Sequence, residues 1–170
     1  NDCRLLYHGV AGFFFKVLAN FRCGDYHYAD MVMQETDMVK ILQATANDVE
    51  DVARLSFEVG RLHDEAMPAY FMPTTEEEHL RIISKMNKDD TTVIFKAVCE
   101  EKICGFLCLY VPKRERKGFV YPRTGVLLNM GVDSGCRGQG IGTDLIKEAE
   151  SYLEKQGIGA LELGVYMFNE

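Results

Sequence analysis

The chain has 170 residues, of which 47% are hydrophobic and 26% are charged, and its formal net charge at pH 7 is −7. This length suits one domain with a core that needs no disulfide or metal staple, so we assign residues 1–170 to a single domain. The negative charge argues against a nucleic-acid partner and favours cationic or neutral substrates. No apolar run reaches the roughly eighteen residues of a membrane span, so we expect no membrane partner.

The six cysteines form no C-x-x-C pair, and no histidine stands at a zinc-site spacing from them. We therefore expect no metal centre and a protein of the reducing cytoplasm. Cys136 lies beside a glycine-rich turn, where a reactive thiol and a bystander thiol both remain open.

Two strand-like runs lie in the first 37 residues. Residues 13–19 form a continuous, aromatic-rich run, and residues 26–34 follow the turn signal Gly24-Asp25. We expect a strand in each.

Residues 38–44 read like the first strand of a domain, and a helix is expected directly after them. Asn47 is the expected N-cap of that helix, because Glu50 stands at the capping-box position.

The next segment, residues 62–71, is expected to be irregular because Pro68 interrupts it. Thr74 and Glu77 then predict a second capping box, which opens a helix through about Met86.

A β-hairpin follows, with strands at residues 92–99 and 103–111 and a short turn between them. The basic loop at residues 112–124 is expected to be solvated, with a role near ligand phosphates as the alternative.

Residues 127–132 form an apolar run that predicts a buried strand. A glycine-rich turn at residues 137–142 leads from it into an amphipathic helix, whose apolar face is Ile141, Leu145, Ile146, Ala149, Tyr152 and Leu153. Free backbone N–H groups, the helix dipole and small glycines together make such a turn a site for a pyrophosphate.

The glycine spacing discriminates between phosphate-binding motifs. A dinucleotide-binding turn would need a third glycine where Thr143 stands, and a P-loop would need a lysine that is absent. Arg137, Gly140 and Gly142 instead fit Arg-x-x-Gly-x-Gly. This spacing resembles the acetyl-CoA-binding motif of the GNAT superfamily of N-acetyltransferases.

The resemblance implies an α+β fold with three layers (α/β/α). Its sheet would be mixed and largely antiparallel, with one splayed parallel pair formed by the strands near residues 130–132 and 163–165. The order of elements from Met38 onward is the order of that family.

The chain order departs from the family at its two ends. The family continues past the fifth strand with an Asn, a helix bearing a tyrosine, and two last strands, and here Asn169, Tyr7 and Gly12 resemble that segment. We expect residues 1–37 to be equivalent to the last helix and final two strands, and residues 38–170 to the first through fifth strands. Circular permutation, exchange between two chains and an unrelated N-terminal arm are the alternatives.

The resemblance also implies a binding site for acetyl-CoA as co-substrate. The backbone of Met130 and Val132 would hold the thioester end, and Asn169 would reach the pantetheine arm. Gly131 and Gly164 allow close backbone approach or serve packing. The backbone of the turn would hold the pyrophosphate, through Arg137, Gly138, Gln139, Gly140, Ile141, Gly142 and Thr143.

The implied reaction is direct transfer of an acetyl group to a primary amine of a small molecule, protein or peptide. Tyr7 would be the general acid. The general base stays open between Glu65, His63, Glu162 and a chain of water molecules.

A non-catalytic module that binds CoA is the alternative function, because some relatives carry a glutamate on the fourth strand and this one offers only Asn129 and the terminal Asp133. A dinucleotide-binding protein is the distant alternative. Edge strands beside the splay are compatible with a homodimer.

Overall fold

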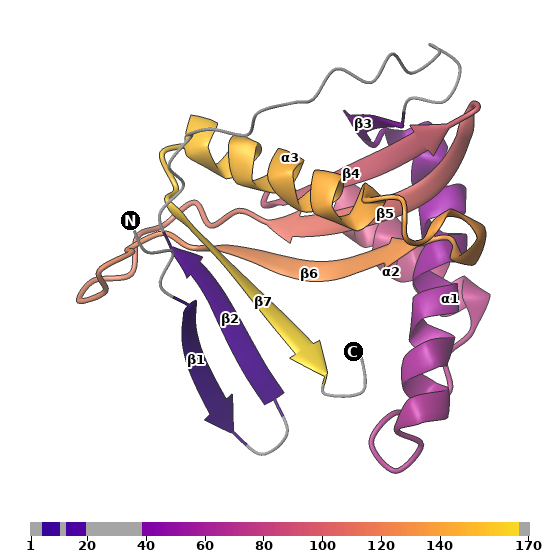
Figure 1. The fold of residues 1–170 in the computed structure, drawn as a ribbon, viewed down its shortest axis with the longest axis horizontal. Coiled ribbons are helices and arrows are strands. Elements are labelled where there is room, and N and C mark those ends of the chain that lie inside the picture. The colour runs from indigo at the N-terminus through magenta and orange to yellow at the C-terminus, as the bar shows by residue number, and fades with distance from the viewer. Residues whose placement is uncertain (1–4, 11–12, 20–38, 167–170) are drawn as a thin grey trace.

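A computed structural model describes residues 5–10, 13–19 and 39–166. Seven described strands form one sheet in the order β1-β2-β7-β6-β5-β4-β3, and the neighbours are antiparallel except for β6 and β7 (Figure 1). The strands are β1 Leu5–Val10, β2 Phe13–Ala19, β3 Lys40–Gln43, β4 Thr92–Cys99, β5 Lys102–Tyr110, β6 Gly125–Val132 and β7 Ala160–Tyr166.

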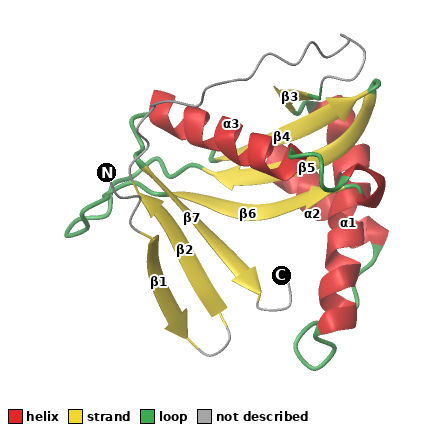
Figure 2. Ribbon diagram, in the orientation of Figure 1, coloured by secondary structure: helices red, strands yellow, loops and turns green. Residues whose placement is uncertain are grey.

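Three described α-helices cover the sheet on two sides (Figure 2): α1 Val49–Ala66, α2 Glu76–Lys88 and α3 Ile141–Lys155. Successive residues of β4 point to opposite faces, as in any strand. Phe95 therefore joins the core under α3, and its neighbour Ile94 joins a second core under α1 and α2. This is the predicted three-layer fold with a mixed sheet. In the described part of the chain, no helix is long and apolar enough to cross a membrane.

The predicted hairpin is confirmed, with a tighter turn than expected. Glu100 and Glu101 alone connect β4 to β5, and their φ angles are 47° and 67°. Two consecutive positive φ angles are typical of a type I′ turn, whose twist matches that of the paired strands.

The starts of α1 and α2 differ from the prediction. A short 3₁₀ turn precedes α1, and the backbone N–H of Thr45, not that of Asn47, donates to the carboxylate of Asp48 at 2.7 Å. Helix α2 begins one residue later than predicted, because Thr75 and Glu78 form the capping box. There Glu78 N–H donates to Thr75 Oγ1 at 3.2 Å, and Thr75 N–H donates to Glu78 Oε2 at 2.9 Å.

Part of the segment expected to be irregular is helical, because α1 continues to Ala66. An ion pair between Arg61 and Glu65, one turn apart, supports this last stretch. The helix ends at Ala66 with Met67 as its C-cap, directly before Pro68, which cannot continue it.

The N-terminal segment also departs from the expectation. Leu5–Val10 is a strand and not the helix implied by the resemblance, and it pairs with β2 from Leu5↔Leu18 to Val10↔Phe13. A second strand close in sequence gives β2 an antiparallel partner, which leaves fewer unpaired backbone groups at the sheet edge. The predicted strand at residues 13–19 is confirmed, and the one at residues 26–34 lies outside the described residues.

Candidate functional site

The two parallel strands separate along their length. They pair only from Gly125↔Leu161 to Leu127↔Leu163, and beyond this point β6 and β7 diverge toward their C-terminal ends (Figure 1). The predicted splay is therefore present, and among the described strands β6 has no partner on its β7 side beyond Leu127.

The register of β6 directs specific backbone groups into this opening. Leu128 is extra in the pairing with β5, because Cys108 faces Asn129 while Leu109 faces Leu127. Beyond the bulge, the N–H of Asp133 donates to Cys104 O at 2.9 Å. In an antiparallel ladder this bond makes Val132 and its partner Gly105 a pair without mutual hydrogen bonds.

The same alternation applies two residues earlier, at Met130. The backbone N–H and C=O groups of Met130 and Val132 therefore point away from β5, toward the side that β7 has left. Their side chains pack against the core under α3. An extended ligand chain in the splay could bond to these backbone groups as an added strand does.

The loop after β6 exposes the start of helix α3. Gly138 and Gly140 have φ angles of 77° and 82°, a region that side chains other than glycine rarely adopt. Gly140 is the N-cap of α3, and no side chain caps the helix there. The first backbone N–H groups of α3 are thus free to bind an anion.

The glycines of this loop also leave space around it. A Cβ atom built on Gly138 or Gly140 meets nothing within 4 Å, and one on Gly142 meets only Met130 Cε at 3.9 Å. Gln139 and Thr143 are exposed. The donor set and the open approach fit the pyrophosphate of acetyl-CoA.

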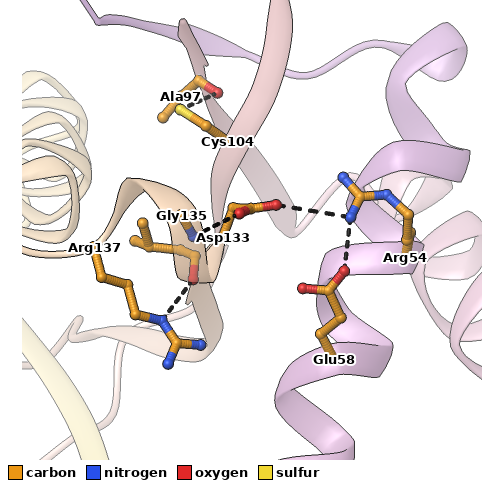
Figure 3. Close-up of polar contacts among 8 residues, drawn as sticks. Arg54, Glu58, Ala97, Cys104, Asp133, Gly135 and Arg137 are labelled. Carbon is orange, nitrogen blue, oxygen red and sulfur yellow. Dashed lines mark hydrogen bonds and ion pairs between the residues drawn. The ribbon is translucent and has the colours of Figure 1, made fainter.

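Arg137 is fixed at the start of this loop (Figure 3). Its Nε donates to the carbonyl oxygen of Val132 at 3.0 Å, and the residue is exposed. This bond satisfies a carbonyl that β7 leaves unpaired, and it holds a permanent positive charge beside the glycine turn.

Helix α1 contributes a second arginine, which the sequence did not single out. Arg54 Nη1 lies 2.7 Å from Glu58 Oε1 and 3.9 Å from Asp133 Oδ2 (Figure 3). The other carboxylate oxygen of Asp133 accepts from Gly135 N–H at 2.9 Å. Asp133 thus links the loop to α1.

Gly131 serves packing. A Cβ atom there would lie 2.5 Å from Val59 Cγ2 and 2.9 Å from Phe106 Cε1, so this glycine lets β6 approach α1. The sequence left two roles open for Gly131, close approach of a ligand and internal packing, and the structure supports packing.

A buried polar chain connects β6 to both helices on this face. Asn129 Nδ2 donates to Ser56 Oγ at 3.0 Å, and Ser56 Oγ lies 2.8 Å from His79 Nδ1. The chain ends at Thr74, whose Oγ1 lies 3.0 Å from His79 Nε2. Ser56 is 1% exposed and His79 is 9% exposed.

Burial lowers the pKa of His79 below its ordinary value of 6.5, although the nearby carboxylates of Asp64 and Glu78 act in the opposite direction. Burial thus favours the neutral form of the His79 imidazole. These hydrogen bonds were not predictable from the sequence, whose one signal for them is Ser56 on the apolar face of a helix.

The candidate general bases are not brought together. Glu65 forms an exposed ion pair with Arg61 at 3.0 Å, at the end of α1. His63 is half-buried, and its ring centroid lies 5.6 Å from that of Phe71. Glu162 is half-buried on β7, opposite Val126 in the paired part of the two strands.

Two further predicted residues have different outcomes. Tyr7 lies on strand β1 opposite Lys16, so the expected placement on a helix is wrong. Asn169 lies outside the described residues, and its role stays a prediction.

The thiols near the site are mostly buried. Burial raises the pKa of Cys104 to about 11 and that of Cys108 to about 12. Cys136 is half-buried in the loop after β6. The described side chains include no group of three or more His, Cys, Asp or Glu residues arranged to hold a metal ion.

Comparisons with known proteins agree with this geometry. The model of the acetyltransferase (GNAT) family matches residues 59–170. A search of curated proteins gave no match.

Three solved structures illustrate the likeness. A mutant of the BH1408 protein from Bacillus halodurans is 26% identical, with a TM-score of 0.67 over 76% of this chain and 85% of that chain. An aminoglycoside acetyltransferase from an uncultured soil metagenomic sample, solved with sisomicin, is 21% identical, with a TM-score of 0.57 over 78% and 80%. The ribosomal-protein-alanine N-acetyltransferase of Brucella melitensis is 19% identical, with a TM-score of 0.55 over 74% and 79%.

The family match covers more than half of the chain, and it includes the splayed strands and the glycine turn. The chain belongs to the acetyltransferase (GNAT) family.

Proposed function

We propose that this protein transfers an acetyl group from acetyl-CoA to a primary amine by direct attack. The single observation that supports it best is the combination of a splayed β6–β7 pair with an uncapped, glycine-lined start of α3. One feature offers donors for an extended arm, and the other offers donors for a diphosphate.

In this proposal the backbone does most of the binding. The N–H groups at the start of α3 and of its preceding turn hold the pyrophosphate, and the Arg137 guanidinium adds positive charge. The backbone groups of Met130 and Val132 hold the arm and the thioester carbonyl. A fixed N–H near that oxygen stabilises the negative charge that develops on it during attack.

Acetyl-CoA supplies an activated acyl group, so the protein needs no nucleophile of its own. Its remaining task is to orient an unprotonated amine against the thioester and to accept the amine's proton.

For the acceptor, we propose a chemical class, a primary amine. One structural neighbour acetylates an aminoglycoside and another acts on a ribosomal-protein alanine, so amines of both a small molecule and a peptide are candidates. The overall charge of −7 favours a cationic acceptor.

Thiol release from acetyl-CoA tests the proposal. We would assay the protein with sisomicin, spermidine and an alanine-initial peptide, and measure acetyl-CoA binding by calorimetry in parallel. Saturable release with at least one amine supports acetyl transfer.

A second candidate is a module that binds CoA without turnover, favoured by Asn129 in place of a carboxylate on β6. Tight CoA binding without thiol release from any of the three amines would support it and contradict the transferase.

A further inference from the structure

The series of hydrogen-bonded side chains Asn129, Ser56, His79 and Thr74 begins where β6 and β7 separate. Asn129 comes two residues after Leu127, the last residue of β6 that pairs with β7. It contacts Ser56 of α1, whereas the side chains of its neighbour Met130 and of Val132 pack on the α3 side. Asn129 thus faces the side of the sheet that α1 covers, and α3 lies on the other side.

Burying this chain is costly unless each polar group is bonded. A neutral imidazole has one donor and one acceptor nitrogen, and a hydroxyl has one hydrogen to donate. Because the Asn129 Nδ2 group donates to Ser56 Oγ, the Ser56 hydroxyl is free to donate to His79 Nδ1. His79 Nε2–H then donates to Thr74 Oγ1.

In this arrangement the hydrogen bond to Ser56 orients the Asn129 amide. Its nitrogen is held by Ser56, and its oxygen Oδ1 has no hydrogen-bond partner among the described residues. Asn129 is half-buried, so the oxygen is a preorganised acceptor beside the point where the strands part.

We propose that Asn129 Oδ1 accepts a hydrogen bond from the acceptor amine and aims its nitrogen at the thioester, and that Ser56 and His79 are positioning residues that orient this amide. The inference rests on the proposed acetyl transfer and names the residue that receives its amine. An amide oxygen orients an amine without trapping it as an ammonium ion, as a carboxylate would.

The first test is kinetic and uses the full chain with acetyl-CoA and the same three amines: sisomicin, spermidine and an alanine-initial peptide. Asn129→Ala is expected to lower kcat/KM for the amine about tenfold or more, as for loss of a hydrogen bond to a charged or polarised group. The Kd of acetyl-CoA should stay the same. Ser56→Ala should show a smaller loss in the same parameter.

A double-mutant cycle separates positioning from a structural role. If Ser56 acts through the Asn129 amide, Ser56→Ala should have little further effect on kcat/KM in the Asn129→Ala background. Thr75→Ala is the matched control, because it removes the N-cap of α2 and lowers Tm without touching the chain. It should leave kcat/KM unchanged.

The second test is independent of turnover. The ¹⁵N shifts of the His79 ring should report the Nε2–H tautomer near pH 7.5. The Nδ1–H tautomer would direct the bonds the other way and leave Asn129 with a donor facing the splay, which would overturn the proposal.

The outcomes distinguish failure of the proposed acetyl transfer from failure of the role proposed for Asn129. A wild-type protein that turns over none of the three amines contradicts the acetyl transfer and, with it, this inference. A wild-type protein that turns over an amine, together with an unaffected Asn129→Ala variant, contradicts this inference alone. An equal loss of acetyl-CoA affinity and amine kcat/KM in Asn129→Ala would also overturn it.

Discussion

His79 is held neutral between α1 and α2, and this makes the stability of the fold sensitive to pH. Burial lowers the pKa of His79 from 6.5, so below that pH the unfolded chain binds a proton that the folded chain resists. The free energy of unfolding should therefore fall as the pH decreases from 7 to 5. Urea unfolding at each pH measures it.

The matched variant is His79→Gln, which removes the titrating group and keeps a polar side chain. Its free energy of unfolding should depend less on pH over the same interval. An identical pH dependence in both proteins would show that His79 does not titrate with unfolding.

Tyr7 gives a second prediction at the scale of one residue. If its hydroxyl protonates the leaving thiolate, Tyr7→Phe should lower kcat about a hundredfold and leave acetyl-CoA affinity unchanged. This role follows from the resemblance of the sequence to the family, and Tyr7 lies on strand β1. Tyr70→Phe, in an exposed loop, is the control, and an unchanged kcat in Tyr7→Phe would remove Tyr7 from the mechanism.

At the scale of elements, the β4–β5 turn is a site where stability can be raised. Glu101 has a φ of 67°, which costs a residue with a side chain about 1 kcal/mol relative to glycine. Glu101→Gly should raise Tm by about 2–4 °C, with no change in acetyl-CoA affinity. A lower Tm measured by calorimetry would contradict the turn geometry.

Most strands after residue 12 were predictable from local pattern, whereas strand β1 and the starts of α1 and α2 were not. The strand predicted at residues 127–132 and the hairpin follow from apolar runs between turn signals, and both were confirmed. At α2, Thr74 and Thr75 each precede a glutamate by three residues, so the sequence alone offers two equal caps. The contact of Thr74 with His79 separates them, and it depends on tertiary packing.

The start of α1 shows the same limit. Asp48, which bonds to Thr45, also pairs with Lys96 of β4 at 2.6 Å. Burial alone would raise the pKa of Asp48, but the hydrogen bonds from Lys96 and Thr45 lower it below its ordinary value. A partner 48 positions away in sequence decides this cap, and local propensity has no access to it.

At the scale of the whole molecule, strand β2 pairs along its full length with β7, from Phe13↔Tyr166 to Ala19↔Ala160. This register makes β1 and β2 part of the same sheet as β7. We propose that residues 1–37 stand for the elements that follow the fifth strand in relatives with the usual order.

A rearranged chain tests this proposal. A variant that starts at Met38 and joins residue 170 to residue 1 through a short flexible linker should fold and keep its acetyl-CoA affinity, because the same contacts form. A variant opened between Glu100 and Glu101 is the control and should be less stable, since it cuts a tight turn. Failure of the first variant to fold, beside a folded parent chain, would contradict the proposal.

The site divides in the same way between what sequence could and could not give. The glycine turn was predictable because its donors lie together within residues 137–143. The hydrogen bond between Asn129 and Ser56 was not predictable, because the two residues are 73 positions apart and neither belongs to a known short motif.

The central claim is that backbone groups at the start of α3 hold the diphosphate of acetyl-CoA. Gly142→Ala tests it, because alanine is the better helix former by about 0.5–1 kcal/mol, and an added Cβ meets no protein atom closer than 3.9 Å. The variant should be at least as stable as the wild type, yet its methyl group would occupy the space that a phosphate needs. Glu154→Ala, in the last turn of the same helix, is the control.

The decisive measurement is calorimetric titration of acetyl-CoA into these three proteins. We expect saturable binding to the wild type and to Glu154→Ala, and binding about tenfold weaker or more to Gly142→Ala, since a fixed phosphate would lose charge-assisted hydrogen bonds. Equal affinity in Gly142→Ala, or no binding to the wild type, would contradict the account.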